Sequence, residues 1–206
     1  MSSDIDSNVR AKAWLDPDQV SALRNACYDE AFPAYLQQRN DAIITLLYDS
    51  GLRVGELVQV DSEMLRAGRS ELYLPGHIQK DYPTDNSPSA VTMALASDTA
   101  RTLNSYLVSR WKDTPALFPS RKSDRITEQG VRHMLRKVAE TASIQPWLVD
   151  GSRGDADDVT PHVFRHSVAY RMLHEEDGNT LYDVRNRLRH RSLQTTERVY
   201  DHFKTV

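Results

Sequence analysis

Apolar residues recur at helical spacing along most of this chain, and only two short stretches alternate in the way that strands do. The helical patterns cover residues 17–27, 39–50, 53–61, 97–112, 127–142, 160–176, 180–190 and 195–203. The strand patterns cover residues 70–76 and 89–95, and a loop rich in Pro, Asp and Asn separates them. We therefore predict a mainly α fold with a small antiparallel β-sheet (α+β).

Signals for helix ends support these ranges. Asp16 can cap the first helix, with Pro17 in its first turn, and Thr160 can cap the helix that begins at Pro161. Gly51 is suited to stop the second helix, since glycine accepts the left-handed conformation that ends many helices.

Length and composition limit the class of protein. The 206 residues allow one large domain or two small ones. The net charge of −3 gives no indication of a nucleic-acid-binding protein. The C-terminal part, residues 160–206, is nevertheless basic, with eight Lys and Arg against six Asp and Glu. The start of the chain is polar and lacks the apolar run of a secretory signal, so we expect a cytoplasmic protein. Cys27, the single cysteine, lies in an apolar helical pattern and is expected to be a buried core thiol.

The stretch TPHVFRHSV places His162, Arg165 and His166 on one face of a helix, because they are three and four residues apart. Two histidines four residues apart can hold zinc, but the glutamate of the HExxH signature is absent. An arginine beside two imidazoles suits a phosphate, since guanidinium binds phosphate oxygens in a bidentate manner. A solvated helix face with a core histidine is the simpler alternative.

Three further residues are candidates only in combination. Arg53 follows a Gly-Leu break where a helix begins, and Glu56 could orient its guanidinium or cap the turn. Lys80 lies in the loop between the two strands, and Tyr200 lies in the last helical pattern. Taken singly, each is typical of an ordinary surface or core residue.

Together, in order and spacing, these pieces resemble the catalytic domain of the tyrosine recombinase (phage integrase) family, archaeal or viral integrases included. The matching pieces are SGLRVGEL with Arg53, Lys80 in a β-hairpin, TPHVFRHS with His162 and Arg165, LRHRS with His190, and TTERVY with Tyr200. The resemblance implies the tyrosine recombinase catalytic-domain (DNA breaking-rejoining enzyme) fold over residues 15–206. Residues 1–14 are then expected to be a flexible N-terminal tail, with the family's N-terminal core-binding domain absent.

The resemblance implies a site-specific DNA recombinase or integrase that cuts and rejoins strands through a covalent 3′-phosphotyrosyl intermediate, without metal, ATP or other cofactor. Its partners would be double-stranded DNA at a specific attachment or recombination site and further copies of itself in a tetrameric synapse on DNA. No membrane is involved.

The resemblance also implies residue roles. Arg53 and Arg165 would clamp the non-bridging phosphate oxygens, and His190 would donate a hydrogen bond to one of them. Lys80 would protonate the leaving 5′ oxygen. His162 would act as donor or general base near Tyr200, the nucleophile.

Four other tyrosines are rivals for the role of nucleophile. Tyr106, Tyr170 and Tyr182 lie in apolar helical patterns and are expected to serve packing, and Tyr82 lies in the hairpin loop.

Two features depart from the family pattern. Arg189 stands where the family usually has the glycine of Leu-Gly-His, and it is expected to alter the local backbone or to add a DNA phosphate contact. The hairpin loop from His77 to Pro88 is long and lacks Gly-Lys-Gly, and Lys80 is its one lysine.

Three alternatives remain open from the sequence. A type IB topoisomerase-like strand transferase would share the tyrosine chemistry. A non-cleaving DNA-binding remnant or regulator would share the fold. A zinc-dependent hydrolase would use His162 and His166.

Overall fold

A computed structural model describes residues 13–80, 88–200 and 203 of the chain. Helices dominate the described part, as predicted. They are α1 (Pro17–Ala26), α2 (Ala34–Ser50), α3 (Val54–Gln59), α4 (Ser97–Ser109), α5 (Glu128–Thr141), α6 (Pro161–His174), α7 (Leu181–Leu188) and α8 (Leu193–Tyr200). Short 3₁₀ turns lie at Ser62–Met64, Ala67–Arg69, Gly76–Ile78 and Ala156–Asp158.

Two small antiparallel sheets accompany the helices. One has the order β2-β3-β4, formed by β2 (Leu65–Arg66), β3 (Glu71–Leu74) and β4 (Val91–Ala94). Residues 70–76 and 89–95 were predicted as its hairpin, and the pairing of β3 with β4 confirms this. The sequence did not reveal β2, which is two residues long.

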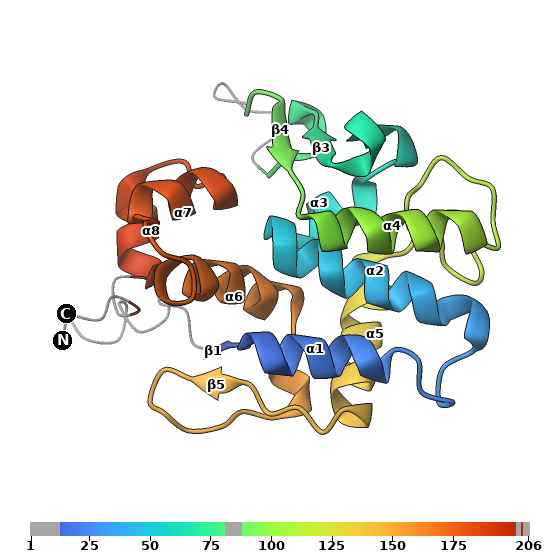
Figure 1. The fold of residues 1–206 in the computed structure, drawn as a ribbon, viewed down its shortest axis with the longest axis horizontal. Helices are drawn as coiled ribbons and strands as arrows, with labels where there is room; N and C mark the ends of the chain where they lie inside the picture. The colour runs from blue at the N-terminus through green and yellow to red at the C-terminus, as the bar shows by residue number, and fades with distance from the viewer. Residues whose placement is uncertain (1–12, 81–87, 201–202, 204–206) are drawn as a thin grey trace.

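Helix α2 lies at the centre of the molecule, with α4 above it and α1 below it in Figure 1, and it contacts both. It is buried nearly all round, because Ile43, Ile44, Leu46 and Leu47 are all fully inaccessible. Pro33 is its N-cap, and the helix therefore starts at Ala34, before the predicted range of 39–50. Cys27 is also fully buried, as expected.

The start of the chain as described belongs to the folded unit. Ala13 and Trp14 were expected in a flexible tail over residues 1–14, but they form β1 and pair with β5 (Trp147–Leu148). Two-residue strands carry no alternation that a sequence pattern could reveal. Residues 1–12 of that expected tail lie outside the described residues.

Asp16 and Thr160, which were both predicted as N-caps, cap helices α1 and α6. The Asp16 carboxylate accepts the Gln19 backbone N–H at 2.8 Å, and Gln19 accepts the Asp16 N–H at 3.1 Å, which completes a capping box. The Thr160 side chain accepts the Val163 N–H at the start of α6.

The C-terminal helices α6, α7 and α8 lie side by side at the left of Figure 1 and share an apolar cluster of their own. Its buried members include Val168, Val184, Leu188 and Tyr200. This cluster brings the end of the chain against α6. Across the described ranges, no helix combines the length and apolar character required to span a membrane.

Candidate active site

Arg53 is fixed by Glu56 at the start of α3. The backbone N–H of Arg53 donates to Glu56 Oε2 at 2.8 Å, and its Nη1 donates to Glu56 Oε1 at 3.1 Å. Glu56 therefore both caps the turn and orients the guanidinium, the two roles that the sequence left open. The Arg53 side chain is partly exposed, at 29%, and lines a cleft of about 620 Å³.

Glu56 is a buried carboxylate, 1% exposed, and it binds a second arginine. Arg189 Nη2 donates to Glu56 Oε2 at 2.7 Å. Burial would raise the pKa of the Glu56 carboxyl, but the charges of Arg189 and Arg53 outweigh burial and hold the pKa below its ordinary value. Glu56 is thus ionised at neutral pH.

Arg165 is 2% exposed and joins the ends of two helices. Its Nη1 donates to the Gly51 carbonyl at 2.5 Å, and its Nη2 donates to the Leu188 carbonyl. These carbonyls lie at the C-terminal ends of α2 and α7, where the helix dipole favours a cation. Burial, and next the positive charge of Arg53, lower the pKa of Arg165, so its guanidinium gains from any anion bound nearby.

Tyr200 is buried within reach of the charges of Arg165 and Arg53, with 1% of its surface exposed. Its hydroxyl lies 3.1 Å from Nδ1 of His166, and its ring stacks on His190 with centroids 5.8 Å apart. Burial raises the pKa of Tyr200 to about 12, although Arg165 and then Arg53 oppose the increase. The phenol is therefore neutral at pH 7 and needs a base to become a nucleophile.

His190 lies in the same cleft as Arg53, and a buried threonine orients its ring. His190 Nδ1 lies 2.9 Å from the hydroxyl of Thr196, which is fully buried on α8. Burial, followed by the charges of Arg165 and Arg53, lowers the pKa of His190 to about 3. The imidazole is thus neutral at pH 7. If the Thr196 hydroxyl donates to Nδ1, then Nε2 carries the proton and is the donor.

His162 and Lys80 complete the set that the resemblance singled out. His162 is exposed at the start of α6, and its ring contacts that of His166 edge to face, with centroids 4.3 Å apart. Partial desolvation, and then cationic neighbours that include Lys80, lower the pKa of His162. Lys80 is exposed and lines the same cleft as Arg53 and His190.

The structure thus gathers all six predicted residues, from segments far apart in sequence, around one cleft and the buried layer beneath it. The imidazole that hydrogen-bonds to Tyr200 is that of His166, rather than the His162 that the sequence suggested. His166 and Thr196 are the partners that sequence reasoning missed. The sequence placed His166 on a helix face suited to zinc or to a phosphate but gave it no role toward Tyr200, and its position directly after Arg165 was the available signal.

The other tyrosines lie elsewhere. Tyr106 is buried and donates to the Leu117 carbonyl at 2.9 Å, and Tyr170 stacks on Trp14, so both serve packing as expected. Tyr182 was expected to pack as well, but it is 57% exposed because it faces outward on α7. Tyr82 lies outside the described residues.

Arg189 adopts an unusual backbone conformation. It ends α7 in the left-handed region, with φ 56° and ψ 44°, which glycine accepts freely and other residues adopt at a cost of about 1–2 kcal/mol. Its side chain is only 6% exposed and points to Glu56. The expected alteration of the local backbone is thus present, and the expected contact between Arg189 and a DNA phosphate stays a prediction.

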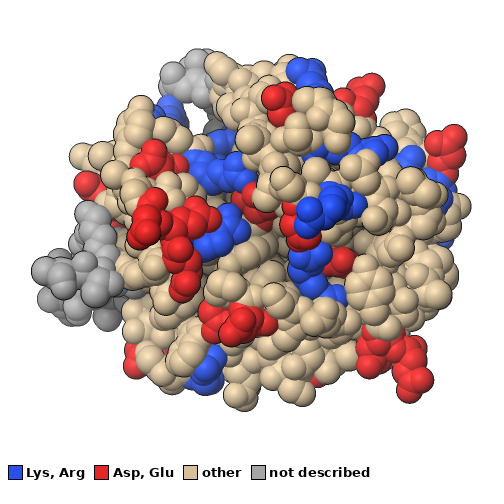
Figure 2. Space-filling model, in the orientation of Figure 1, with Lys and Arg blue, Asp and Glu red and all other residues tan. Residues whose placement is uncertain are grey.

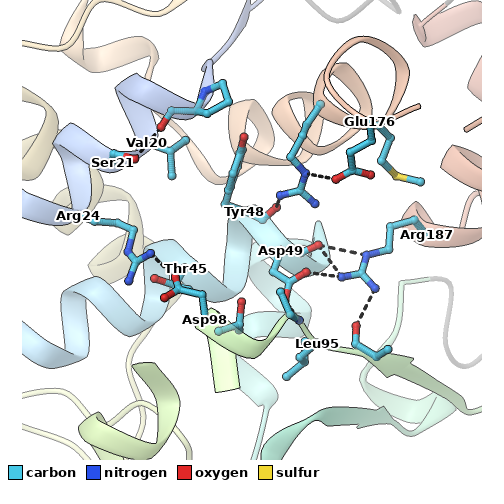
Figure 3. Close-up of a pocket in the computed structure, with 16 residues that line it drawn as sticks. Val20, Ser21, Arg24, Thr45, Tyr48, Asp49, Leu95, Asp98, Glu176 and Arg187 are labelled. Carbon is cyan, nitrogen blue, oxygen red and sulfur yellow. Dashed lines mark hydrogen bonds and ion pairs between the residues drawn. The ribbon is translucent and has the colours of Figure 1, made fainter. Parts of the chain in front are cut away.

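A second cleft of about 660 Å³ lies between α1, α2, α6 and α7, and its charges are already paired (Figure 3). Arg187 Nη2 contacts Asp49 Oδ1 at 2.5 Å, and Arg24 Nη1 contacts Asp98 Oδ2 at 2.5 Å. Arg187 also donates to the carbonyls of Asp49 and Ala94, which pins α7 to α2 and β4. The contacts of Arg187 in this second cleft therefore hold α7 in place, together with Arg189 and His190 at its end.

On the face seen in Figure 2, side chains of both signs are interspersed, so this face is no continuous basic surface.

No group of three or more His, Cys, Asp or Glu side chains that could hold a metal ion occurs within residues 13–80, 88–200 and 203. The zinc alternative also required His166, which is engaged with Tyr200.

Comparison with known structures identifies the fold. The chain superposes on a solved XerA recombinase with a TM-score of 0.70 at 24% identity, covering 94% of this chain and 60% of that one. It superposes on a XerH site-specific recombinase bound to its difH substrate with a TM-score of 0.68 at 18% identity, covering 92% and 50%. The fold is that of the catalytic domains of tyrosine recombinases.

Comparison of sequences identifies the family. The chain belongs to the phage integrase family, whose sequence profile matches residues 13–205. It is 30% identical to tyrosine recombinase XerC of Herpetosiphon aurantiacus over 164 residues, which cover 80% of this chain and 48% of that protein. It is 31% identical to XerC of Roseiflexus castenholzii over 188 residues, covering 91% and 54%. The chain therefore spans about half the length of these relatives.

Proposed function

We propose that this protein is a site-specific DNA recombinase or integrase that cuts and rejoins DNA through a covalent 3′-phosphotyrosyl intermediate on Tyr200. The observation that carries the proposal is the position of the phenol. Its hydroxyl contacts an imidazole nitrogen, its ring stacks on a second imidazole, and the charges of two guanidiniums act on it. Without bound DNA this environment is costly, because it concentrates positive charge; a phosphodiester would supply the missing anion.

The proposed cleavage step transfers the 3′ phosphate of one DNA strand to Tyr200. The Tyr200 oxygen attacks phosphorus, the bond from phosphorus to the 5′ oxygen breaks, and the phosphotyrosyl ester keeps the bond energy for rejoining. Arg53, Arg165 and the neutral His190 donate hydrogen bonds to the non-bridging oxygens, where negative charge collects in the transition state. Lys80 delivers a proton to the leaving 5′ oxygen.

The phenol proton requires an acceptor in this scheme. His166 Nδ1 lies within hydrogen-bond reach of the Tyr200 hydroxyl, at 3.1 Å, and is suited to take the proton as attack begins. His162 stacks edge on against His166, and in our proposal it passes the proton from the buried pair toward solvent.

The proposed substrate is double-stranded DNA at a specific site, with self-assembly into a tetrameric synapse on that DNA. In support, one similar solved structure is that of a XerH site-specific recombinase bound to its difH substrate. We also propose that the catalytic domain covers residues 13–205, the range that the family profile matches. The proposed location is the cytoplasm, where such DNA is accessible.

Covalent trapping tests the proposal without knowledge of the DNA site. The protein is incubated in EDTA-containing buffer with a pool of nicked suicide duplexes that have a randomised central segment. Adducts are resolved on a denaturing gel and sequenced. We expect an adduct that carries a shared sequence and that survives denaturation.

The outcomes separate the alternatives. DNA binding without any adduct would support a non-cleaving regulator. Relaxation of a supercoiled circle without strand exchange between duplexes would support a topoisomerase-like strand transferase. Hydrolysis that EDTA abolishes would support the zinc hydrolase.

A further inference from the structure

Arg189 belongs to the charge network of the candidate site, although the family pattern has glycine at this position. Its Nη2 shares Glu56 Oε2 with the backbone N–H of Arg53, at 2.7 and 2.8 Å respectively. The other carboxylate oxygen, Oε1, accepts from Arg53 Nη1 at 3.1 Å. One buried carboxylate therefore holds both arginines in a fixed relation.

The second arginine changes what the carboxylate does to the first. A lone Glu56–Arg53 pair would cancel the positive charge that a phosphate needs. Because both Arg53 and Arg189 bind Glu56, the three side chains together carry one net positive charge. Arg53, the partly exposed member, presents that charge to the cleft.

Arg189 breaks two local rules at once, which is typical of a position held for function. Its φ of 56° lies in the left-handed region that glycine favours. Its Nε is buried and makes no hydrogen bond within the described ranges of the chain. A simple helix cap requires neither a guanidinium nor these two unfavourable features.

We propose that Arg189 is a positioning residue for Arg53: by binding Glu56 it holds the Arg53 guanidinium in place for the scissile phosphate and offsets the carboxylate charge. This inference rests on the proposed function. Arg189 borders the same cleft as Arg53, but its side chain is only 6% exposed and its Nη2 is bound to Glu56, so in this inference it acts through that carboxylate.

Three variants separate charge from backbone. Arg189→Met removes the cation and keeps the non-glycine backbone, Arg189→Lys keeps the cation, and Arg189→Gly removes the cation while relieving the left-handed conformation. Because a small displacement of a positioning group costs about 100-fold in rate, we expect single-turnover cleavage to fall about 100-fold in the Met and Gly variants. The Lys variant should retain cleavage within about tenfold, and DNA affinity should change little in all three.

The Gly variant makes the test selective. A role confined to the helix end predicts that glycine, which accepts the left-handed conformation, leaves cleavage intact. Our inference predicts slower cleavage by Arg189→Gly even though the backbone conformation is relieved. Cleavage by Arg189→Gly within about threefold of the original chain would overturn it.

A double-mutant cycle with Glu56→Gln tests the route of the effect. If Arg189 acts through the Glu56 carboxylate, the addition of Arg189→Met to the Glu56→Gln variant should lower the cleavage rate by less than about threefold. Full additivity of the two losses would contradict the inference.

A readout independent of catalysis keeps this inference separate from the proposed function. Glu56 accepts the Arg53 backbone N–H, so hydrogen exchange of that amide reports whether the carboxylate is held in place. We expect the Arg53 amide to exchange about tenfold faster in Arg189→Met than in the original chain, while amides of α5 stay unchanged. Unchanged exchange at Arg53 would overturn the inference even if Tyr200 forms no adduct, and absence of the adduct alone would overturn only the proposed function.

Discussion

Removal of the Glu56 carboxylate should destabilise the protein far more than removal of a surface carboxylate. Glu56 is 1% exposed and holds Arg189, whose side chain is 6% exposed. Loss of one partner from a buried ion pair costs about 3–5 kcal/mol, because the other charge stays buried and unpaired. We therefore expect Glu56→Ala to lower the free energy of unfolding by about 3–5 kcal/mol, a large part of the about 5–15 kcal/mol of a typical domain.

Denaturant titration followed by circular dichroism measures this loss. Glu56→Gln keeps an acceptor oxygen but removes the charge, so it should cost less, about 1.5–3 kcal/mol. Glu140→Ala is the matched control, since Glu140 forms an exposed pair with Arg136 one helical turn away. That variant should cost under about 1 kcal/mol. A loss below about 1 kcal/mol for Glu56→Ala would refute the claim that this carboxylate is the centre of a buried charge network.

The same carboxylate gives a pH dependence of defined sign. The folded pKa of Glu56 lies below its unfolded value, which is about 4.3. Its contribution to stability is therefore complete above that unfolded value and is lost as the pH falls through the lower folded pKa. Glu56→Gln should flatten this part of the stability curve, and an unchanged acid limb in the variant would contradict the assignment.

Two further variants test the support around the site. Thr196→Val removes the hydroxyl that holds His190, so cleavage should fall about 10- to 100-fold with little change in DNA affinity, whereas Thr141→Val on α5 should cleave normally. Gly51→Ala places a Cβ about 2.5 Å from Leu188 Cδ2 at a φ of 61°, so the free energy of unfolding should fall by about 2–4 kcal/mol. Equal cleavage by Thr196→Val, or unchanged stability of Gly51→Ala, would contradict the respective contact.

Helical periodicity was sufficient to predict most of the helices, and the strand-like alternation of residues 70–76 and 89–95 predicted the β3–β4 hairpin. Helix ends were less predictable where the deciding contact is tertiary. Helix α2, for example, begins at Ala34, before its apolar pattern becomes regular. The pairing of β1 with β5 was not predictable, because two residues carry no pattern and their partners are distant in sequence.

The candidate site was predictable as a set of residues but not as a geometry. The motifs singled out Arg53, Arg165 and Tyr200, and the structure brings them together. Motifs do not show where a side chain points. The contact of Arg189 with Glu56 on α3 and the hydrogen bond between Tyr200 and His166 depend on how α7 and α8 pack against the rest of the fold.

The most direct test of the central claim is the covalent adduct with nicked suicide duplexes in the presence of EDTA, compared between the original chain and Tyr200→Phe. Phenylalanine keeps the buried ring and its stacking on His190 but lacks the nucleophilic oxygen. The account predicts a denaturation-resistant protein–DNA adduct for the original chain and none for the variant, with DNA binding retained by both. An adduct that persists in Tyr200→Phe would contradict it.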